Sequence, residues 1–184
     1  MKKIFINANQ LLDSSFALAK QIVIQNFKPD IIVGVWRGGS SIAIAIHEYF
    51  EYVGWHCDHT AIRASSYSLI DQQNTHVELS NLDYLIDKLK TDRRVLLVDD
   101  VFDTGGSVDA IIKRIHDLSD YAHKAEIKVA TPWFKPERNQ QSFGPDFYLY
   151  QTNDWLVFPH ELLGLSEQEI RSGKEIDWNR LKPD

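Results

Sequence analysis

Two short apolar runs constrain the fold of this chain more than any other feature. Residues 31–35 are aliphatic except at Gly34, and residues 95–98 are aliphatic throughout. Runs without polar alternation are typical of strands that are buried on both faces of a sheet. Each run is followed by a polar turn that contains glycines and then by a helical pattern. This alternation predicts an α/β fold in which helices flank a mostly parallel central sheet.

Other segments fit the same alternation. Apolar residues recur with helical spacing in two places, through Leu12, Phe16, Ala19 and Val23 and through Val108, Ile111, Ile112, Ile115 and Leu118. Further strands are expected at residues 61–62, 127–130 and 147–150, and a short helix is expected near residues 166–172. Residues 65–79 are polar and predict a long mobile loop or an extended hairpin.

Length and composition narrow the class of protein. A chain of 184 residues is expected to form a single domain, residues 1–184. The 20 Lys and Arg residues against 26 Asp and Glu residues give a net charge of −6, so no nucleic-acid partner is expected. Cys57 is the only cysteine of the sequence, which excludes an intrachain disulfide and favours a reducing compartment. No apolar stretch approaches the roughly 20 residues that cross a bilayer, so we expect no membrane partner and a cytoplasmic protein.

The most informative segment joins the second apolar run to the helical pattern after it. The run ends in Asp99 and Asp100, and after two further residues come Asp103, Thr104, Gly105, Gly106 and Ser107. Glycines let the backbone turn tightly at a helix N-terminus, where backbone N–H groups and the hydroxyls of Thr104 and Ser107 can bind an anion. The adjacent carboxylates would repel a phosphate, so their expected partners are ribose hydroxyls or a hard cation such as Mg²⁺. The segment therefore fits a sugar phosphate; the alternative is a solvated turn with Asp103 as a helix N-cap.

This segment resembles the phosphoribosyl pyrophosphate signature of the type I phosphoribosyltransferases. The resemblance covers roughly residues 28–163 and implies the type I phosphoribosyltransferase fold with a small C-terminal hood, about residues 132–165 plus N-terminal residues. It implies that Asp99 and Asp100 lie at the ribose diol and the metal, and that Asp103 to Ser107 hold the 5′-phosphate. It also makes Asp103 the catalytic residue, which lies near N7 of a purine and helps to manage its proton.

A second turn follows the first apolar run. Arg37, Gly38 and Gly39 form a cationic glycine turn before a helix start, and Arg37 supplies a fork of donors. Because loops at the carboxyl ends of parallel strands share one edge of the sheet, this turn is expected to face the acidic segment. It resembles the pyrophosphate loop of the family, in which a non-proline cis peptide often presents an amide. Trp36 stands where a small residue is common in that loop.

Two further resemblances concern the residues that contact the base and the flexible loop that closes over the reacting centre. Ser66 and Tyr67, in the polar stretch, resemble the start of the flexible loop that closes over the reacting centre in purine enzymes. Lys135 precedes a proline and Trp155 precedes a later proline turn, as in the 6-oxopurine branch, where such residues contact the base oxygen and stack on the ring. Judged without the resemblance, Trp155 is expected in the core and Lys135 in solvent. The backbone carbonyls of Leu156 and Glu161 are expected to accept from a guanine 2-amino group.

The pattern most resembles the short bacterial xanthine–guanine and hypoxanthine–guanine phosphoribosyltransferases. It implies transfer of 5-phosphoribosyl from phosphoribosyl pyrophosphate to N9 of a 6-oxopurine, with Mg²⁺ as cofactor, by a homodimer or homotetramer. The alternative is a non-catalytic regulator of the same fold that senses the sugar donor. A lesser alternative is an enzyme of this fold for adenine or a pyrimidine.

Overall fold

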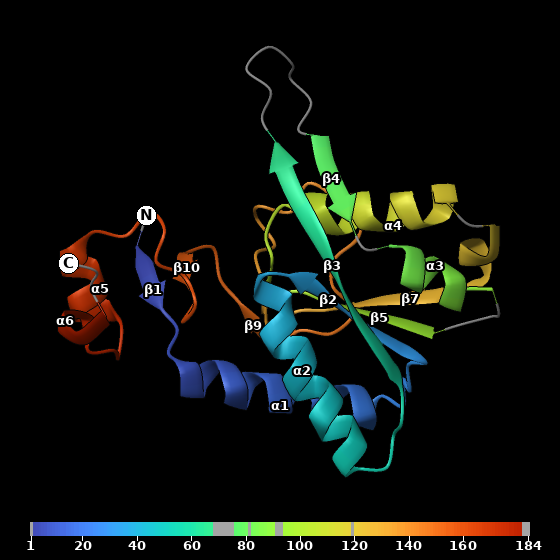
Figure 1. The fold of residues 1–184 in the computed structure, drawn as a ribbon, viewed down its shortest axis with the longest axis horizontal. Helices are drawn as coiled ribbons and strands as arrows, with labels where there is room; N and C mark the ends of the chain where they lie inside the picture. Colours follow the sequence, from blue (N-terminus) through green and yellow to red (C-terminus); the bar gives the residue numbers. More distant parts are fainter. Residues whose placement is uncertain (1, 68–75, 81, 91–93, 119, 182–184) are drawn as a thin grey trace. The chain divides into compact units, whose positions relative to one another are not determined.

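The computed structural model describes residues 2–67, 76–80, 82–90, 94–118 and 120–181 (Figure 1). The chain forms two compact units, one made of Met1–Asp13 and Asp154–Asp184 and the other of Ser14–Asn153. Helix α1 (Ala8–Ile24) belongs in part to each of them. No helix within the described residues is long and apolar enough to cross a membrane. The single domain expected from the sequence, residues 1–184 with a hood at about residues 132–165 plus N-terminal residues, stays a prediction.

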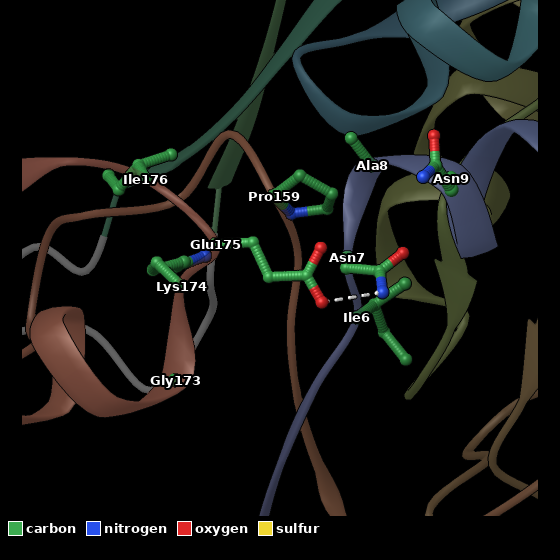
Figure 2. Close-up of a pocket in the computed structure, with 9 residues that line it drawn as sticks. All are labelled: Ile6, Asn7, Ala8, Asn9, Pro159, Gly173, Lys174, Glu175 and Ile176. Carbon is green, nitrogen blue, oxygen red and sulfur yellow. Dashed lines mark hydrogen bonds between the residues drawn. The ribbon is translucent and has the colours of Figure 1, made fainter.

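The smaller unit joins the two ends of the chain through a parallel pair of strands. β1 (Lys3–Phe5) pairs with β10 (Trp155–Val157), and Ile4 lies opposite Leu156. The helices α5 (Glu167–Gly173) and α6 (Trp178–Leu181) follow, which confirms the helix expected near residues 166–172. Figure 2 shows the start of α1 beside the segment after α5, where Asn7 Nδ2 donates to Glu175 Oε1 at 3.0 Å.

The larger unit is built on a five-stranded sheet in the order β4-β3-β2-β5-β7. The strands are β2 (Ile31–Trp36), β3 (Asp58–Tyr67), β4 (His76–Ser80), β5 (Arg94–Val98) and β7 (Glu126–Ala130). β3, β2, β5 and β7 run parallel, and β4 pairs antiparallel with β3 at the edge. The predicted α/β fold with a mostly parallel sheet is therefore confirmed, and β3 with β4 forms the hairpin that was one of two options for the polar stretch. Residues 68–75 of that stretch lie outside the described residues.

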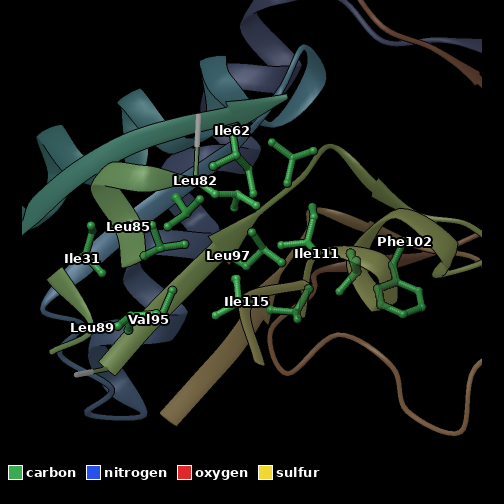
Figure 3. Packing of buried hydrophobic residues seen from close by; sticks show 14 residues of the cluster. Ile31, Ile62, Leu82, Leu85, Leu89, Val95, Leu97, Phe102, Ile111 and Ile115 are labelled. Atoms are coloured by element: carbon green, nitrogen blue, oxygen red, sulfur yellow. The ribbon is translucent and has the colours of Figure 1, made fainter. Parts of the chain in front are cut away.

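Helices cover both faces of this sheet, which explains the unbroken apolar runs. α2 (Gly38–Tyr52) lies against one face, where Ala43 approaches Gly34, and α3 (Asp83–Lys88) and α4 (Gly106–Leu118) cover the other (Figure 1). A 3₁₀ helix, Asp120–Lys124, follows α4. Figure 3 shows the core on the side of α3 and α4, which includes Ile31, Ile62, Leu85, Val95, Leu97, Ile111 and Ile115.

A smaller parallel sheet lies in the same unit and corrects one expectation. It contains β6 (Val101–Phe102), β8 (Trp133–Phe134) and β9 (Tyr150–Gln151). Residues 147–150 do not form the strand expected from their composition, because only Phe147 bridges to Ala130 and β9 starts at Tyr150. Pro132 explains the break: it has no N–H to continue the ladder, and its carbonyl accepts from both Leu149 and Tyr150.

Helix α1 is where the sequence predicts it, but its buried face differs from the expected stripe. Ala19 is buried as expected, whereas Phe16 is exposed. Leu18 and Ile22 are the fully buried neighbours of Ala19 instead. The helical period alone leaves the choice between adjacent stripes open, since both contain apolar residues at the required spacing.

Candidate active site

Asp99 and Asp100 lie directly after β5, at the carboxyl edge of the sheet. The Asp99 N–H donates to the Ala130 carbonyl at 3.2 Å, and the Asp100 N–H donates to Asp99 Oδ1 at 2.9 Å. Both residues are half-buried. Removal from water raises the pKa of Asp99 well above its usual value, and the negative charge of Asp100 raises it further. A nearby cation would therefore stabilise the ionised form of these two carboxylates.

The glycine turn after β2 lies against this acidic pair. The peptide bond between Trp36 and Arg37 is cis, as in the pyrophosphate loops that the sequence resembles. A Cβ on Gly38 would lie 1.8 Å from Asp100 Oδ2, and a Cβ on Gly39 would lie 2.1 Å from the Val98 carbonyl oxygen. Only glycine permits this approach. Arg37 is exposed at the N-terminus of α2, and the two glycines that follow it lie against the carboxyl end of β5 and its acidic pair.

The segment from Asp103 to Ser107 forms a tight turn into α4. Gly105 has a φ of +76°, and a Cβ there would lie 2.7 Å from the Phe102 ring and 2.7 Å from Gln141 Cγ. The Gly106 N–H donates to Thr104 Oγ1 at 3.3 Å, and the Gly105 carbonyl accepts from Asp109 at 2.9 Å. The first N–H groups of a helix have no intrahelical acceptor. Backbone donors of this turn and the exposed Ser107 side chain are thus of the kind that can bind an anion at a helix start.

Asp103 joins this turn to Lys135. Lys135 Nζ lies 2.9 Å from Asp103 Oδ2, and Arg138 Nε lies 2.5 Å from Asp103 Oδ1. Partial burial acts to raise the pKa of the Asp103 carboxyl, but the hydrogen bonds from the two cations leave that pKa below its ordinary value. The contacts that the structure describes for the Asp103 carboxylate are with these two cations, so they do not support the alternative in which Asp103 caps the helix. The Thr104 hydroxyl contacts the helix start instead.

The sequence analysis missed Arg138, although a signal was present. The Arg138 N–H donates to the Lys135 carbonyl at 3.1 Å, which closes a turn with Pro136 at its second position. Proline is favoured at that position of a β-turn. A Lys-Pro-x-Arg sequence after a strand thus indicates that both cations point back toward the same side of the chain.

The two base-site candidates have the opposite exposure to that expected from composition. Lys135 is 5% exposed and Trp155 is 55% exposed. Lys135 is buried because the Phe102–Phe134 pairing brings it beside Asp103, where its ammonium has an ionic partner. Trp155 starts the short strand β10 of the other unit, where its indole ring remains accessible for stacking.

Leu156 and Glu161 lie in the smaller unit with Trp155. The Trp155 N–H donates to Lys2, and the Val157 carbonyl accepts from Ile6. Because successive residues of a strand direct their backbone groups to opposite sides, the Leu156 N–H and carbonyl point away from β1. Glu161 Oε2 accepts from the Phe158 N–H at 2.8 Å. The Leu156 carbonyl is thus placed at an open strand edge, while the Glu161 side chain holds the turn that follows.

Ser66 and Tyr67 end strand β3, where they pair with Val77 and His76 of β4. The backbone of the hairpin therefore continues to the point where the sequence resembles a covering loop. Their side chains lie outside what the structure describes, so their expected role stays a prediction.

A comparison with family models decides the relationship. The model of the phosphoribosyl transferase domain matches residues 6–162. The chain belongs to the phosphoribosyl transferase domain family. This phosphoribosyltransferase has no match among curated protein sequences.

Solved structures agree with this assignment. A purine phosphoribosyltransferase from Pyrococcus horikoshii is 28% identical, with a TM-score of 0.67 over 91% of this chain and 99% of that one. A Helicobacter pylori xanthine-guanine-hypoxanthine phosphoribosyltransferase is 22% identical, with a TM-score of 0.60 over 85% and 90% of the two chains. A hypothetical protein from Neisseria gonorrhoeae with bound ppGpp is 20% identical, with a TM-score of 0.72 over 95% and 96%. The predicted fold and resemblance are confirmed, and the phosphoribosyltransferase is an enzyme of this family.

The acidic pair also fits the divalent cation that this family implies. Within the described residues no three His, Cys, Asp or Glu side chains form a metal-binding group. Mg²⁺ needs no such cage, since it is commonly held by one or two carboxylates together with substrate oxygens and waters. Burial raises the pKa of Asp99 most, repulsion by Asp100 raises it further, and a nearby cation would favour the charged form against both. Asp99 and Asp100 are therefore chemically suited to Mg²⁺.

Proposed function

We propose that this phosphoribosyltransferase acts on 6-oxopurines. In the reaction, the bond between C1′ of the sugar and the pyrophosphate oxygen breaks and a bond from C1′ to N9 forms. The base loses one proton, which passes to water or to the released pyrophosphate. The observation that carries the proposal is the buried Lys135 ammonium, held 2.9 Å from Asp103 directly before the phosphate turn. A buried cation beside the sugar site offers a donor to a carbonyl oxygen of the base.

The sugar donor is proposed to lie across the three turns at the sheet edge. Thr104, Gly105, Gly106 and Ser107 bind the 5′-phosphate through the helix start, and Asp99 and Asp100 hold the ribose diol and Mg²⁺. Arg37, Gly38 and Gly39 bind the pyrophosphate, because the glycines let the turn lie against the acidic pair and the guanidinium matches phosphate oxygens. Bound Mg²⁺ supplies positive charge that stabilises the leaving pyrophosphate.

Asp103 is proposed to accept a hydrogen bond from N7 of the purine. Its lowered pKa keeps the carboxylate ionised at neutral pH, so it stabilises a proton at N7 and the positive charge that develops at the sugar. When the base binds, Lys135 divides its donors between Asp103 and the base oxygen. An ammonium has three donors, so both contacts are possible at once.

Base selection is proposed to rest on Lys135, Trp155, Leu156 and Glu161. The exposed Trp155 ring stacks on the purine, and the Leu156 and Glu161 carbonyls accept from a 2-amino group. Guanine and hypoxanthine are favoured over xanthine, which presents an acceptor at C2. Ser66 and Tyr67 belong to the segment that covers the reacting centre and excludes water.

The enzyme is further proposed to be a cytoplasmic homodimer or homotetramer. Trp36, Ile44 and Tyr52 on β2 and α2 are exposed, and exposed apolar groups of this kind support self-association. Light scattering measures the mass of the assembly directly. An Ile44→Lys variant of lower mass supports association through this surface, and a monomeric wild type contradicts it.

The central experiment is a spectrophotometric assay of purified protein with phosphoribosyl pyrophosphate and Mg²⁺. The bases are guanine, hypoxanthine, xanthine, adenine, uracil and orotate. Formation of a nucleotide from guanine or hypoxanthine supports the proposal. Turnover with adenine or a pyrimidine instead moves the enzyme to another branch, and binding of the sugar donor without turnover of any base favours the regulatory alternative.

A further inference from the structure

The chain continues beyond the part that matches the family model. That match ends at residue 162, and the structure continues with α5 and α6. We refer to residues 163–181 as the C-terminal segment and to Phe158–Glu161 as the hood turn. Both lie in the smaller unit, so the contacts between them are defined within one compact body.

Lys174 connects the C-terminal segment to the hood turn. It follows α5 directly, is 8% exposed, and its Nζ donates to the Phe158 carbonyl. Burial lowers the pKa of Lys174, while the charge of Glu161 acts in the opposite direction. A buried ammonium is costly unless it is hydrogen-bonded. The contact with Phe158 is therefore one that the fold keeps.

Glu161 holds Phe158 from the other side. Its Oε2 accepts from the Phe158 N–H at 2.8 Å, and its own N–H donates to the Phe158 carbonyl at 3.0 Å. Both backbone groups of Phe158 are thus bound by charged side chains, one from within the turn and one from the C-terminal segment. The His160 ring lies parallel to the Phe158 ring at 6.0 Å. This arrangement fixes the turn that directly follows β10.

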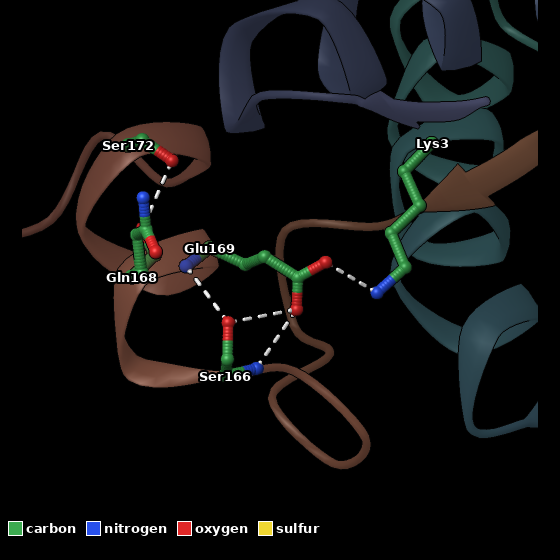
Figure 4. A network of polar contacts seen from close by, with 5 residues as sticks. All are labelled: Lys3, Ser166, Gln168, Glu169 and Ser172. Carbon is green, nitrogen blue, oxygen red and sulfur yellow. Dashed lines mark hydrogen bonds and ion pairs between the residues drawn. The ribbon is translucent and has the colours of Figure 1, made fainter.

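The C-terminal segment is itself fastened to the strands beside the hood turn. Ser166 and Glu169 form a reciprocal cap at the start of α5, and Glu169 Oε1 accepts from Lys3 Nζ of β1 at 2.5 Å (Figure 4). Lys174 lines the pocket shown in Figure 2. Its neighbour Glu175 accepts a hydrogen bond from the Asn7 side chain. Because β1 pairs with β10, these contacts position Lys174 relative to the strand that carries Trp155 and Leu156.

We propose that Lys174 is a positioning residue for base binding, through which the C-terminal segment sets the orientation of the hood turn. The inference rests on the proposed function, in which Leu156 and Glu161 present carbonyls to the base. Lys174 does not contact the base in this proposal. It holds the Phe158 peptide so that the Leu156 and Glu161 carbonyls, before and after Phe158 in the chain, both face the base.

The test compares Lys174→Met with Arg171→Met. Arg171 lies in α5, the helix that Lys174 follows, and pairs only with Glu167 among the residues that the structure describes, so it provides a matched loss of one cation. In Lys174→Met, the KM for guanine is expected to rise about tenfold, with little change in the KM for the sugar donor. Arg171→Met leaves both KM values unchanged. Lys174→Arg, which keeps a cationic donor, recovers most of the loss.

A second measurement separates positioning from general damage. Amide hydrogen exchange of residues 156–161 is expected to increase in Lys174→Met and not in Arg171→Met, with the sheet of the larger unit unaffected. If Lys174→Met does not fold, Lys174→Gln is measured in the same way. Equal rises in both KM values, or an unchanged KM for guanine in a folded variant, overturn the inference while wild-type turnover stands. A wild type that uses no purine defeats the proposed function instead, and exchange then decides alone whether Lys174 holds the turn.

Discussion

Lys135 and Asp103 are side by side because of strand register. The parallel pairing of Phe102 with Phe134 places the residues that follow them next to each other, and the two charged groups meet at 2.9 Å. The Lys135 N–H also donates to the Phe102 carbonyl at 2.9 Å. The smaller sheet thus links the turn that is proposed to bind phosphate to the proposed base donor. A substitution of Asp103 or of Lys135 therefore also changes the surroundings of the other residue.

Asp103→Asn is expected to reduce kcat by roughly 100-fold or more, the scale of a positioned acid–base group. Asparagine keeps the shape of the side chain but removes the charge that stabilises a proton at N7. Steady-state kinetics with guanine measures the effect. Lys113→Met, at an exposed ion pair on α4, is the control that should retain normal turnover. Near-normal turnover in Asp103→Asn would contradict the role of the carboxylate.

The same substitution is expected to lower the free energy of unfolding at neutral pH by about 1–2 kcal/mol, because it leaves the buried Lys135 without an ionic partner. The folded pKa of Asp103 is below its unfolded value, so the stabilisation is present above the unfolded pKa of about 3.9. It is lost as the pH falls through the folded pKa. Urea unfolding from about pH 7 down to about pH 3 should show that the free energies of unfolding of the wild type and the variant converge in acid. A constant difference would contradict the linkage.

The sequence predicts the sheet edge well because its determinants are local. Apolar runs and glycines mark the strands and the turns into α2 and α4, and strand adjacency then brings Gly39 against Asp99. The Asp103–Lys135–Arg138 cluster depends on residues far apart in the chain and on the register of β6 with β8, which composition does not encode. The burial of Lys135 was for this reason the reverse of the expectation from residue type, and only the resemblance indicated its importance.

Gly39→Ala should weaken binding of the sugar donor. The new Cβ would lie 2.1 Å from the Val98 carbonyl oxygen and 2.8 Å from Asp99 Cα, so one backbone segment must move. Overpacking of this kind costs about 1–3 kcal/mol. The KM for phosphoribosyl pyrophosphate is expected to rise and the thermal midpoint to fall. An unchanged KM in the folded variant would show that the turn does not contact the pyrophosphate.

Turnover should require a divalent cation held at Asp99 and Asp100. It is expected to stop in excess chelator and to return with Mg²⁺ or Mn²⁺. Asp99→Asn removes a carboxylate whose folded pKa is raised, so at neutral pH the variant should be at least as stable as the wild type while its turnover falls. Denaturation and kinetics on the same samples test both effects. Full activity in chelator would exclude the proposed metal site.

Lys135→Met should remove the discrimination between 6-oxopurines and adenine. A 6-oxopurine presents an acceptor at C6 to the Lys135 ammonium, which can only donate, whereas adenine presents an amino donor. A buried polar group left unpaired costs about 1–3 kcal/mol, and a tenfold preference needs only about 1.4 kcal/mol. In the variant, kcat/KM for guanine should therefore fall by at least tenfold relative to that for adenine, with a smaller change in the KM for the sugar donor.

Part of the loss with guanine will come from Asp103, which keeps Arg138 as its partner. Arg138→Met separates the two contributions, because it removes the other cation and leaves the Lys135 donor in place. An Lys135→Met enzyme that still prefers guanine over adenine to the wild-type extent would show that another group reads the base oxygen.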